Sequence, residues 1–171
     1  EWIHRFLGRI IGLSFLIPLI FFSFKVDFKN LRSLYFIFFL ICLQGFIGWY
    51  MVSSGLIKNN DVSHFRLSVH LTLALFILCL IFWLILDLFN TKRFQIKISN
   101  LLLFFILVLI ILQIILGAFL SGLDGGLIYN SWPDMNGTFS PSDVSINEYF
   151  NSQLFYNPSI VQFFHRIAAY I

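Results

Sequence analysis

Long apolar stretches separated by short charged segments form the dominant pattern along this chain. Three stretches contain no Asp, Glu, Lys or Arg; they lie between Arg32 and Lys58, between Arg66 and Asp87, and between Lys97 and Asp124. An α-helix rises 1.5 Å per residue, so about 20 apolar residues cross the hydrocarbon core of a bilayer. The pattern therefore predicts membrane-spanning helices near residues 33–54, 66–90 and 97–121.

Two further helices are predicted at the ends of the chain. One lies near residues 1–25 and takes Arg5 and Arg9 into or near the membrane, because the uncharged residues 10–24 are too few to span it alone. The other begins near Pro158 and is cut off about 14 residues later. We interpret the chain as a fragment of a longer protein whose fold class is an all-α, polytopic membrane helical bundle.

Composition and charge agree with this class and predict an orientation. The chain is 59% hydrophobic and 11% charged, whereas about a quarter of the residues in soluble domains are charged. Lysines and arginines gather in the loops at residues 25–32 and 92–97, which should face the cytoplasm or matrix. The loop at residues 122–157 has neither residue type and should face the periplasm or intermembrane space. Because the net charge of +3 is divided among short loops, no nucleic-acid partner is predicted.

Residues 122–157 are too many for a simple connection, which suggests a functional or covering loop. Its aromatic side chains suit either a lid over the bundle or an aromatic belt in the headgroup layer. A short internal repeat is also present, because Gln and Gly recur with the same spacing at residues 44–48 and 113–117. Small residues let membrane helices approach closely, so packing is sufficient to explain these glycines.

Three histidines stand near one end of predicted helices, and each is followed by a small residue one helical turn later. The pairs are His4 with Gly8, His70 with Ala74, and His165 with Ala169. All three helices enter from the outer side, so the imidazoles should lie at a common depth. Axial ligation of haem needs imidazoles at matching height with a gap between helices. The pattern predicts a haem site with His4, His70 and His165 as metal ligands.

Nearby polar residues have two interpretations each. Glu1 is one turn from His4 and could face the same pocket or stand at the interface, and His4 could instead link two helices by a hydrogen bond. Arg66, one turn before the second histidine, suits a haem propionate or a phospholipid phosphate. Arg166 follows the third histidine. His64 precedes its helix and is predicted to be solvated or interfacial.

Five segments resemble a known family. They are EWIHRFLGRIIG at residues 1–12, QGFIGWYMVSSGL at 44–56, HFRLSVHLTLAL at 64–75, LGAFLSGLDGGLIYNSWPDMNG at 116–137 and NPSIVQFFHR at 157–166. In order and spacing these motifs resemble haem A synthase of the mitochondrial and proteobacterial type, and they cover nearly the whole chain.

The resemblance implies an eight-helix protein built from two four-helix halves, of which this fragment lacks the first and last helices. Residues 1–96 would supply helices of the first half, for the substrate haem. Residues 97–171 would begin the second half, for the cofactor haem.

The resemblance also implies roles for individual residues. In the first half, His4 and His70 would flank haem O, with Arg66 as a further haem-binding residue. Glu1 of the Glu-x-x-His motif would act with His4 in catalysis. In the second half, the resemblance implies that His165 holds a haem b cofactor together with a histidine outside this chain, and Arg166 joins that cofactor-binding set.

The implied activity is oxidation of the C8 methyl of haem O to a formyl group, giving haem A for cytochrome oxidase in a bacterial or mitochondrial inner membrane. The implied partners are haem O, haem O synthase and membrane lipid. The resemblance identifies no electron donor, and the protein could form a homo-oligomer. Two other readings suit the histidines or the helices: a di-haem b-type cytochrome that relays electrons, and a non-catalytic membrane assembly subunit.

Overall fold

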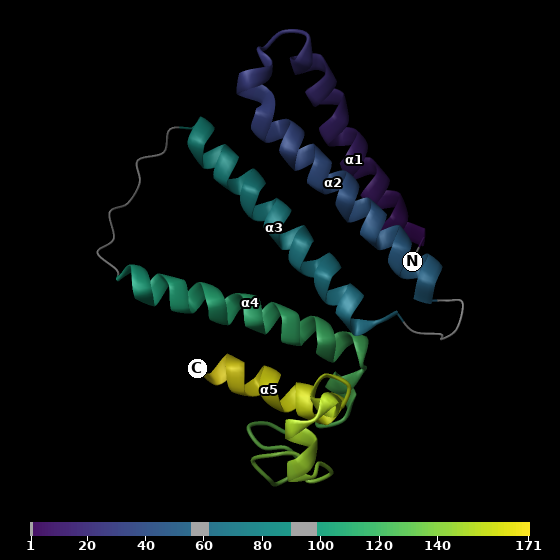
Figure 1. The fold of residues 1–171 in the computed structure, drawn as a ribbon, viewed down its shortest axis with the longest axis vertical. Helices are drawn as coiled ribbons and strands as arrows, with labels where there is room; N and C mark the ends of the chain where they lie inside the picture. The colour runs from purple at the N-terminus through teal and green to yellow at the C-terminus, as the bar shows by residue number, and fades with distance from the viewer. Residues whose placement is uncertain (1, 56–61, 90–98) are drawn as a thin grey trace. The chain divides into compact units, whose positions relative to one another are not determined.

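A computed structural model describes residues 2–55, 62–89 and 99–171 and consists of helices joined by turns and loops (Figure 1). The α-helices are α1 (Trp2–Ser23), α2 (Phe28–Gly55), α3 (His64–Leu88), α4 (Asn100–Gly122) and α5 (Pro158–Tyr170). Three short 3₁₀ helices lie between α4 and α5: η1 (Gly125–Leu127), η2 (Ile146–Phe150) and η3 (Ser152–Phe155). In this described part, the β-type pairing is a single isolated bridge between Met135 and Thr138.

Helices α1 to α4 are each long and apolar enough to cross a bilayer. The predicted all-α, polytopic membrane class is therefore confirmed. The boundary of α2 differs from the prediction, because this helix begins at Phe28 and not near residue 33. Lys29 and Arg32 lie within its first two turns, and both residue types are good helix formers. The uncharged run therefore marks the apolar part of α2 and omits the charged first turn and a half of the same helix.

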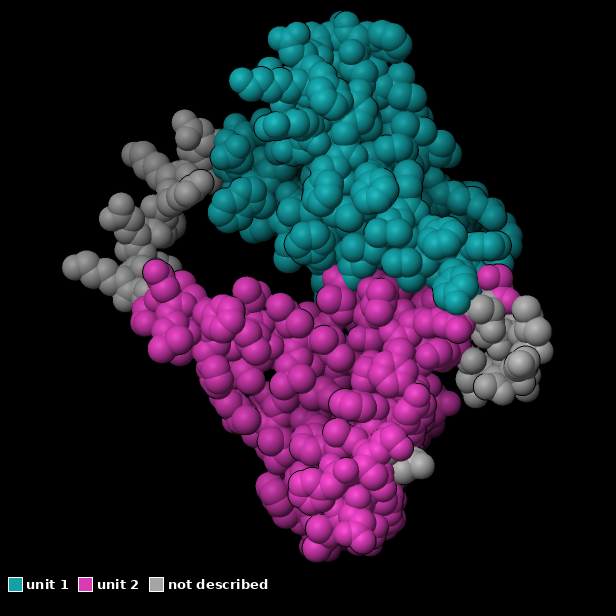
Figure 2. Space-filling view, viewed as in Figure 1, with its two compact units in different colours: residues 1–50, 73–94 teal, residues 51–72, 95–171 magenta. Residues whose placement is uncertain are grey.

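The described chain forms two compact units, coloured separately in Figure 2. Unit 1 comprises residues 1–50 and 73–94, and its core joins α2 to the later turns of α3. Ile37, Leu40 and Ile77 are buried there. Where α1 turns into α2, the hydroxyl groups of Ser23 and Tyr35 lie 2.7 Å apart and hydrogen-bond.

Unit 2 comprises residues 51–72 and 95–171, and within it α5 runs back alongside α4 (Figure 1). The start of α5 is fixed by Asn157, whose side-chain oxygen accepts hydrogen bonds from the backbone of Ser159 at 2.9 Å and Ile160 at 3.4 Å. Pro158 occupies the first helical turn, where its missing N–H costs nothing. The predicted helix start near Pro158 is confirmed, whereas the assignment of residues 1–96 and 97–171 to two halves of a longer protein stays a prediction.

Candidate functional site

The imidazole of His165 on α5 packs against the backbone of α4. A Cβ atom added at Gly117 would lie 3.2 Å from Cε1 and 3.8 Å from Nδ1 of this ring, so the glycine provides the space that the ring fills. One turn earlier on α4, the side-chain nitrogen of Gln113 lies 3.3 Å from Nε2 of His165. The ring is half-buried, and its Nδ1 has no hydrogen-bond partner among the described residues. One amide and one glycine of α4 thus hold this imidazole.

Arg166, beside this histidine, binds the backbone of the α4–α5 loop (residues 123–157). Its Nη1 donates to the carbonyl oxygens of Ser131 at 2.9 Å and Asp134 at 2.8 Å, and its Nη2 donates to the carbonyl of Tyr129 at 2.8 Å. Backbone carbonyls away from water need such partners. Arg166 therefore fixes a loop that contains no Lys or Arg of its own.

Two more side chains on the same face of α5 contact this loop, each one helical turn from Arg166. Gln162 is buried and donates from Nε2 to the Tyr129 carbonyl at 2.9 Å, and the hydroxyl of Tyr170 donates to the Pro133 carbonyl at 3.3 Å. The loop is consequently a folded layer alongside α5. Part of its aromatic content packs inward, whereas Trp132 is 75% exposed.

Asp143 in the α4–α5 loop joins two buried residues. Its carboxylate accepts hydrogen bonds from the hydroxyl groups of Tyr129 at 2.5 Å and Ser159 at 2.7 Å. Partial burial raises the pKa of this carboxyl, but the two hydroxyl hydrogen bonds and one from the Asp143 backbone together lower it by more, so the net pKa lies below its ordinary value. Asp143 is thus ionised at neutral pH and ties the loop to the first turn of α5.

Glu148 plays a similar part at the other end of the loop. The backbone N–H and the hydroxyl of Ser145 donate to one carboxylate oxygen, at 3.2 and 2.9 Å, and the side chain of Asn157 donates to the other at 3.0 Å. These hydrogen bonds lower the pKa of Glu148. The residue that caps α5 is thereby connected to η2.

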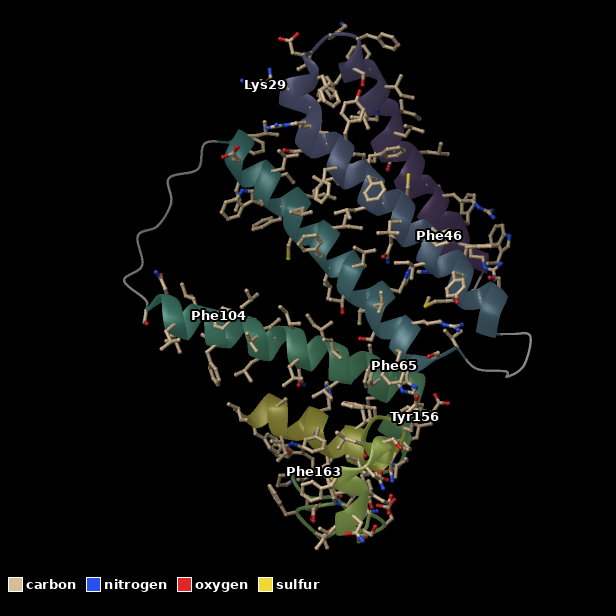
Figure 3. The ribbon with its side chains drawn as sticks, viewed as in Figure 1. Lys29, Phe46, Phe65, Phe104, Tyr156 and Phe163 are labelled. Atoms are coloured by element: carbon tan, nitrogen blue, oxygen red, sulfur yellow. The ribbon has the colours of Figure 1, made fainter. Side chains whose placement is uncertain are left out.

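His64, the first residue of α3, lies among aromatic rings of unit 2. Its ring centroid lies 4.3 Å from Phe65, 5.1 Å from Phe119 and 5.3 Å from Tyr156; Figure 3 labels Phe65 and Tyr156 on their separate segments. A Cβ added at Gly122 would approach the Cα of His64 to 2.8 Å, so α3 and α4 meet closely here. Of the two environments predicted for His64, the solvated one is wrong: the residue is only 6% exposed, because α4 and the α4–α5 loop cover it. An interfacial position stays a prediction.

The predicted substrate-side histidine of unit 1 lies on a part of α1 with free space beside it. His4 is exposed, and a Cβ added at Gly8 or Gly12 meets no atom within 4 Å in the described structure. Glu1 lies outside the described residues. Among the described residues, the surface of Gly8 and Gly12 is therefore uncovered.

Arg66 and His70 lie one helical turn apart on α3, in unit 2, and both are half-buried. Across the described ranges, no three side chains of His, Cys, Asp or Glu gather into a metal-binding cluster. A metal ion bound by His4, His70 or His165 would therefore need most of its ligands from a non-protein group. Haem meets this need because its macrocycle supplies four ligands to the iron.

Sequence reasoning gave no role to Gln113, although a signal was available. The internal repeat aligned the Gln-x-x-x-Gly spacing of residues 113–117 with residues 44–48, and packing was sufficient to explain the glycines. The structure brings both members of the second pair to the His165 ring.

Comparison with known proteins gives one family over the whole chain. The model of the COX15-CtaA family, described as cytochrome oxidase assembly protein, matches residues 1–171. The haem A synthase of Pelagibacter ubique is 67% identical over 173 residues, which cover 100% of this chain and 52% of that protein. The haem A synthase of Rickettsia bellii is 42% identical over 177 residues, which cover 99% of this chain and 52% of that protein.

The chain thus spans about half the length of the curated relatives it matches. No solved structure matches it. Because the family model covers every residue, the chain belongs to the COX15-CtaA family of cytochrome oxidase assembly proteins.

Proposed function

We propose that the full-length protein that contains this chain is a haem A synthase, which oxidises the C8 methyl group of haem O to a formyl group. The observation that carries the proposal is 67% identity, over the whole chain, to a protein of that name. The sequence adds histidines on three separate helices, of which His4 and His70 serve the substrate haem and His165 the cofactor.

The residues around His165 fit a haem b cofactor. A bound imidazole must be oriented by its neighbours, and Gln113 and Gly117 supply that support. Arg166 has five N–H donors, of which three are used by loop carbonyls, so two remain for a haem propionate. In this proposal His165 binds the iron, and Arg166 serves both the loop and the cofactor.

On the substrate side, His4 and His70 bind haem O, Arg66 pairs with a propionate, and Glu1 moves protons. The open glycine surface beside His4 fits a flat ligand. Bound haem supplies the redox chemistry of methyl oxidation, whereas the protein orients the methyl group and excludes competing reactions. A carboxyl group one turn from the ligand histidine is placed to accept or donate protons.

The product of the full-length protein tests the proposal. Membranes in which it is expressed together with a source of haem O are expected to yield haem A, which the formyl group distinguishes in a pyridine haemochrome spectrum and by a mass increase. A matched membrane with the His165→Ala variant controls for haem content. Recovery of unchanged haem O, from a protein that carries its normal haem, would instead identify an electron-relay cytochrome.

The same proposal puts the α4–α5 loop on the periplasmic or intermembrane-space side of an inner membrane, because positive charge gathers in the loops on the opposite side. In the same proposal, haem O synthase supplies the substrate, and the full-length protein can assemble as a homo-oligomer.

Cysteine labelling tests this orientation. In a cysteine-free variant expressed in a bacterial host, Ser140→Cys should react with an impermeant maleimide in intact cells with permeable outer membranes. Lys29→Cys, at the exposed start of α2, should react only after the inner membrane is opened. The reverse pattern would exclude the proposed orientation.

A further inference from the structure

A cleft lies between α2 and α3 at the end of unit 1 where α2 begins and α3 ends (Figure 1). Its volume is about 490 Å³. Each helix contributes one ionic side chain, Arg32 from α2 and Asp87 from α3, and Ser33 adds a hydroxyl group. The rest of the lining is apolar or aromatic and includes Phe36 and Trp83. The cleft thus combines a cation, an anion and an apolar wall.

These groups follow one another along the helices in the order found in a phospholipid. Arg32 directly precedes the uncharged run of α2, and Asp87 directly follows that of α3, so both charges stand at the limit of the apolar region. One helical turn deeper, Phe36 follows Arg32 and Trp83 precedes Asp87. Charges at the ends of membrane helices lie in the headgroup layer. A lipid headgroup would therefore meet the two charges, and an acyl chain would meet the aromatic turn.

The two opposite charges of the cleft are not paired with each other. Arg32 and Asp87 are exposed, and within the described part of the chain neither side chain forms a hydrogen bond or an ion pair. A guanidinium binds a phosphate through charge-assisted hydrogen bonds, and a carboxylate binds a primary ammonium group in the same way. Phosphatidylethanolamine carries a phosphate and a primary ammonium group in one headgroup. Its charges therefore complement those of the cleft.

Other common headgroups match the cleft less well. Phosphatidylglycerol offers a phosphate to Arg32 and no cation to Asp87, so the carboxylate would repel it. Phosphatidylcholine has a cation, but its quaternary ammonium group has no N–H to donate to the carboxylate. Lys29, one turn before Arg32, attracts anionic lipid to this membrane surface in general, but it does not line the cleft. The carboxylate of Asp87 is thus the group that selects among phospholipids.

We propose that this cleft binds one molecule of phosphatidylethanolamine, with the phosphate at Arg32, the ammonium group at Asp87 and an acyl chain along Phe36 and Trp83. The bound lipid joins the start of α2 to the end of α3. The inference goes beyond the proposed function, because it uses no residue assigned to haem and holds for any activity of the full-length protein.

Native mass spectrometry of the full-length protein in detergent tests the site. The protein is mixed with equal amounts of phosphatidylethanolamine, phosphatidylglycerol and phosphatidylcholine, and the retained lipid is identified by its mass. Phosphatidylethanolamine should be retained about fivefold more than either of the others, as expected for one favourable ionic contact at a partly hydrated site.

Two substitutions separate the roles of the charges. Arg32→Gln should lower the retention of phosphatidylethanolamine about two- to fivefold, because the phosphate loses its partner. Asp87→Asn should abolish the preference over phosphatidylglycerol, because the ammonium group loses its partner and the anionic lipid is no longer repelled. Lys29→Gln is the matched control, since it removes an exposed positive charge of the same helix from outside the cleft.

Phe36→Ala leaves both charges in place and shortens the apolar wall, so it should lower the retention of all three lipids. Equal retention of the three lipids, unaffected by these substitutions, would mean that the cleft holds only non-specific annular lipid, and the proposal would be overturned. Absence of any retained phospholipid would overturn it too, as expected if another part of the full-length protein fills the cleft. A preference that survives Asp87→Asn would contradict the role of the carboxylate.

Discussion

Replacing His4 by alanine in the full-length protein is expected to abolish conversion of haem O to haem A while the protein still inserts. The imidazole is proposed to bind the substrate haem, and an alanine offers no ligand at that position. Because His4 is exposed in the described structure, few packing contacts are lost with it. Haem A is measured in membrane extracts and normalised to the amount of inserted protein.

The matched substitution Glu1→Gln separates binding from proton transfer. Glutamine keeps the size of the side chain and removes its acid–base function, so conversion should fall about 10²–10⁴-fold with haem O still bound. Ile3→Ala, a 67% exposed neighbour, should leave conversion unchanged. Normal haem A production by the Glu1 or His4 variant would remove that residue from the proposed site.

Arg166→Ala is expected to release the α4–α5 loop from α5. Three hydrogen bonds from the guanidinium to loop carbonyls are lost. The Tyr129 carbonyl keeps its bond from Gln162 and the Asp134 carbonyl keeps its bond from the Ser131 hydroxyl, whereas the Ser131 carbonyl loses the donor that Arg166 supplied. The loss of these three hydrogen bonds to a charged group should reduce the free energy of unfolding by about 2–3 kcal/mol. Arg166→Lys should recover only part of this, because one ammonium group cannot reproduce the planar fork of a guanidinium.

Digestion by chymotrypsin measures this release, because the loop contains aromatic residues and neither Lys nor Arg. Cleavage between α4 and α5 should be faster in Arg166→Ala than in the wild type, and the thermal unfolding temperature should fall. Lys29→Ala, at the exposed start of α2 (Figure 3), serves as the control for loss of a positive charge. Unchanged cleavage in Arg166→Ala would mean that the other loop contacts are sufficient without this guanidinium.

Helix positions followed directly from the sequence, with errors only where helices leave the apolar region. The run from Lys97 to Asp124 predicted α4, and the Asn-Pro pair at residues 157–158 marked the start of α5. Helix α2 begins earlier than predicted because Lys29 and Arg32, both good helix formers, extend it ahead of the uncharged run.

The partners of individual polar side chains could not be predicted in this way. His64 was predicted to be solvated or interfacial because it precedes its helix, yet Phe119 and Tyr156, distant in sequence, pack against its ring. Gln113 and His165 are 52 positions apart, and Arg166 lies 32 to 37 positions from the carbonyls it binds. No local pattern contains both members of such pairs.

By itself, the sequence determined the membrane class, the span positions and the motifs that place the chain in its family. The sequence is sufficient for these features because hydropathy and motifs both depend on residues that are neighbours along the chain. Only the tertiary structure decided that Arg166 binds the α4–α5 loop, that aromatic rings surround His64 and that Gln113 contacts the ring of His165. These contacts depend on which donors and acceptors come together when α5 packs against α4. A buried polar atom hydrogen-bonds with a partner that this packing brings within reach.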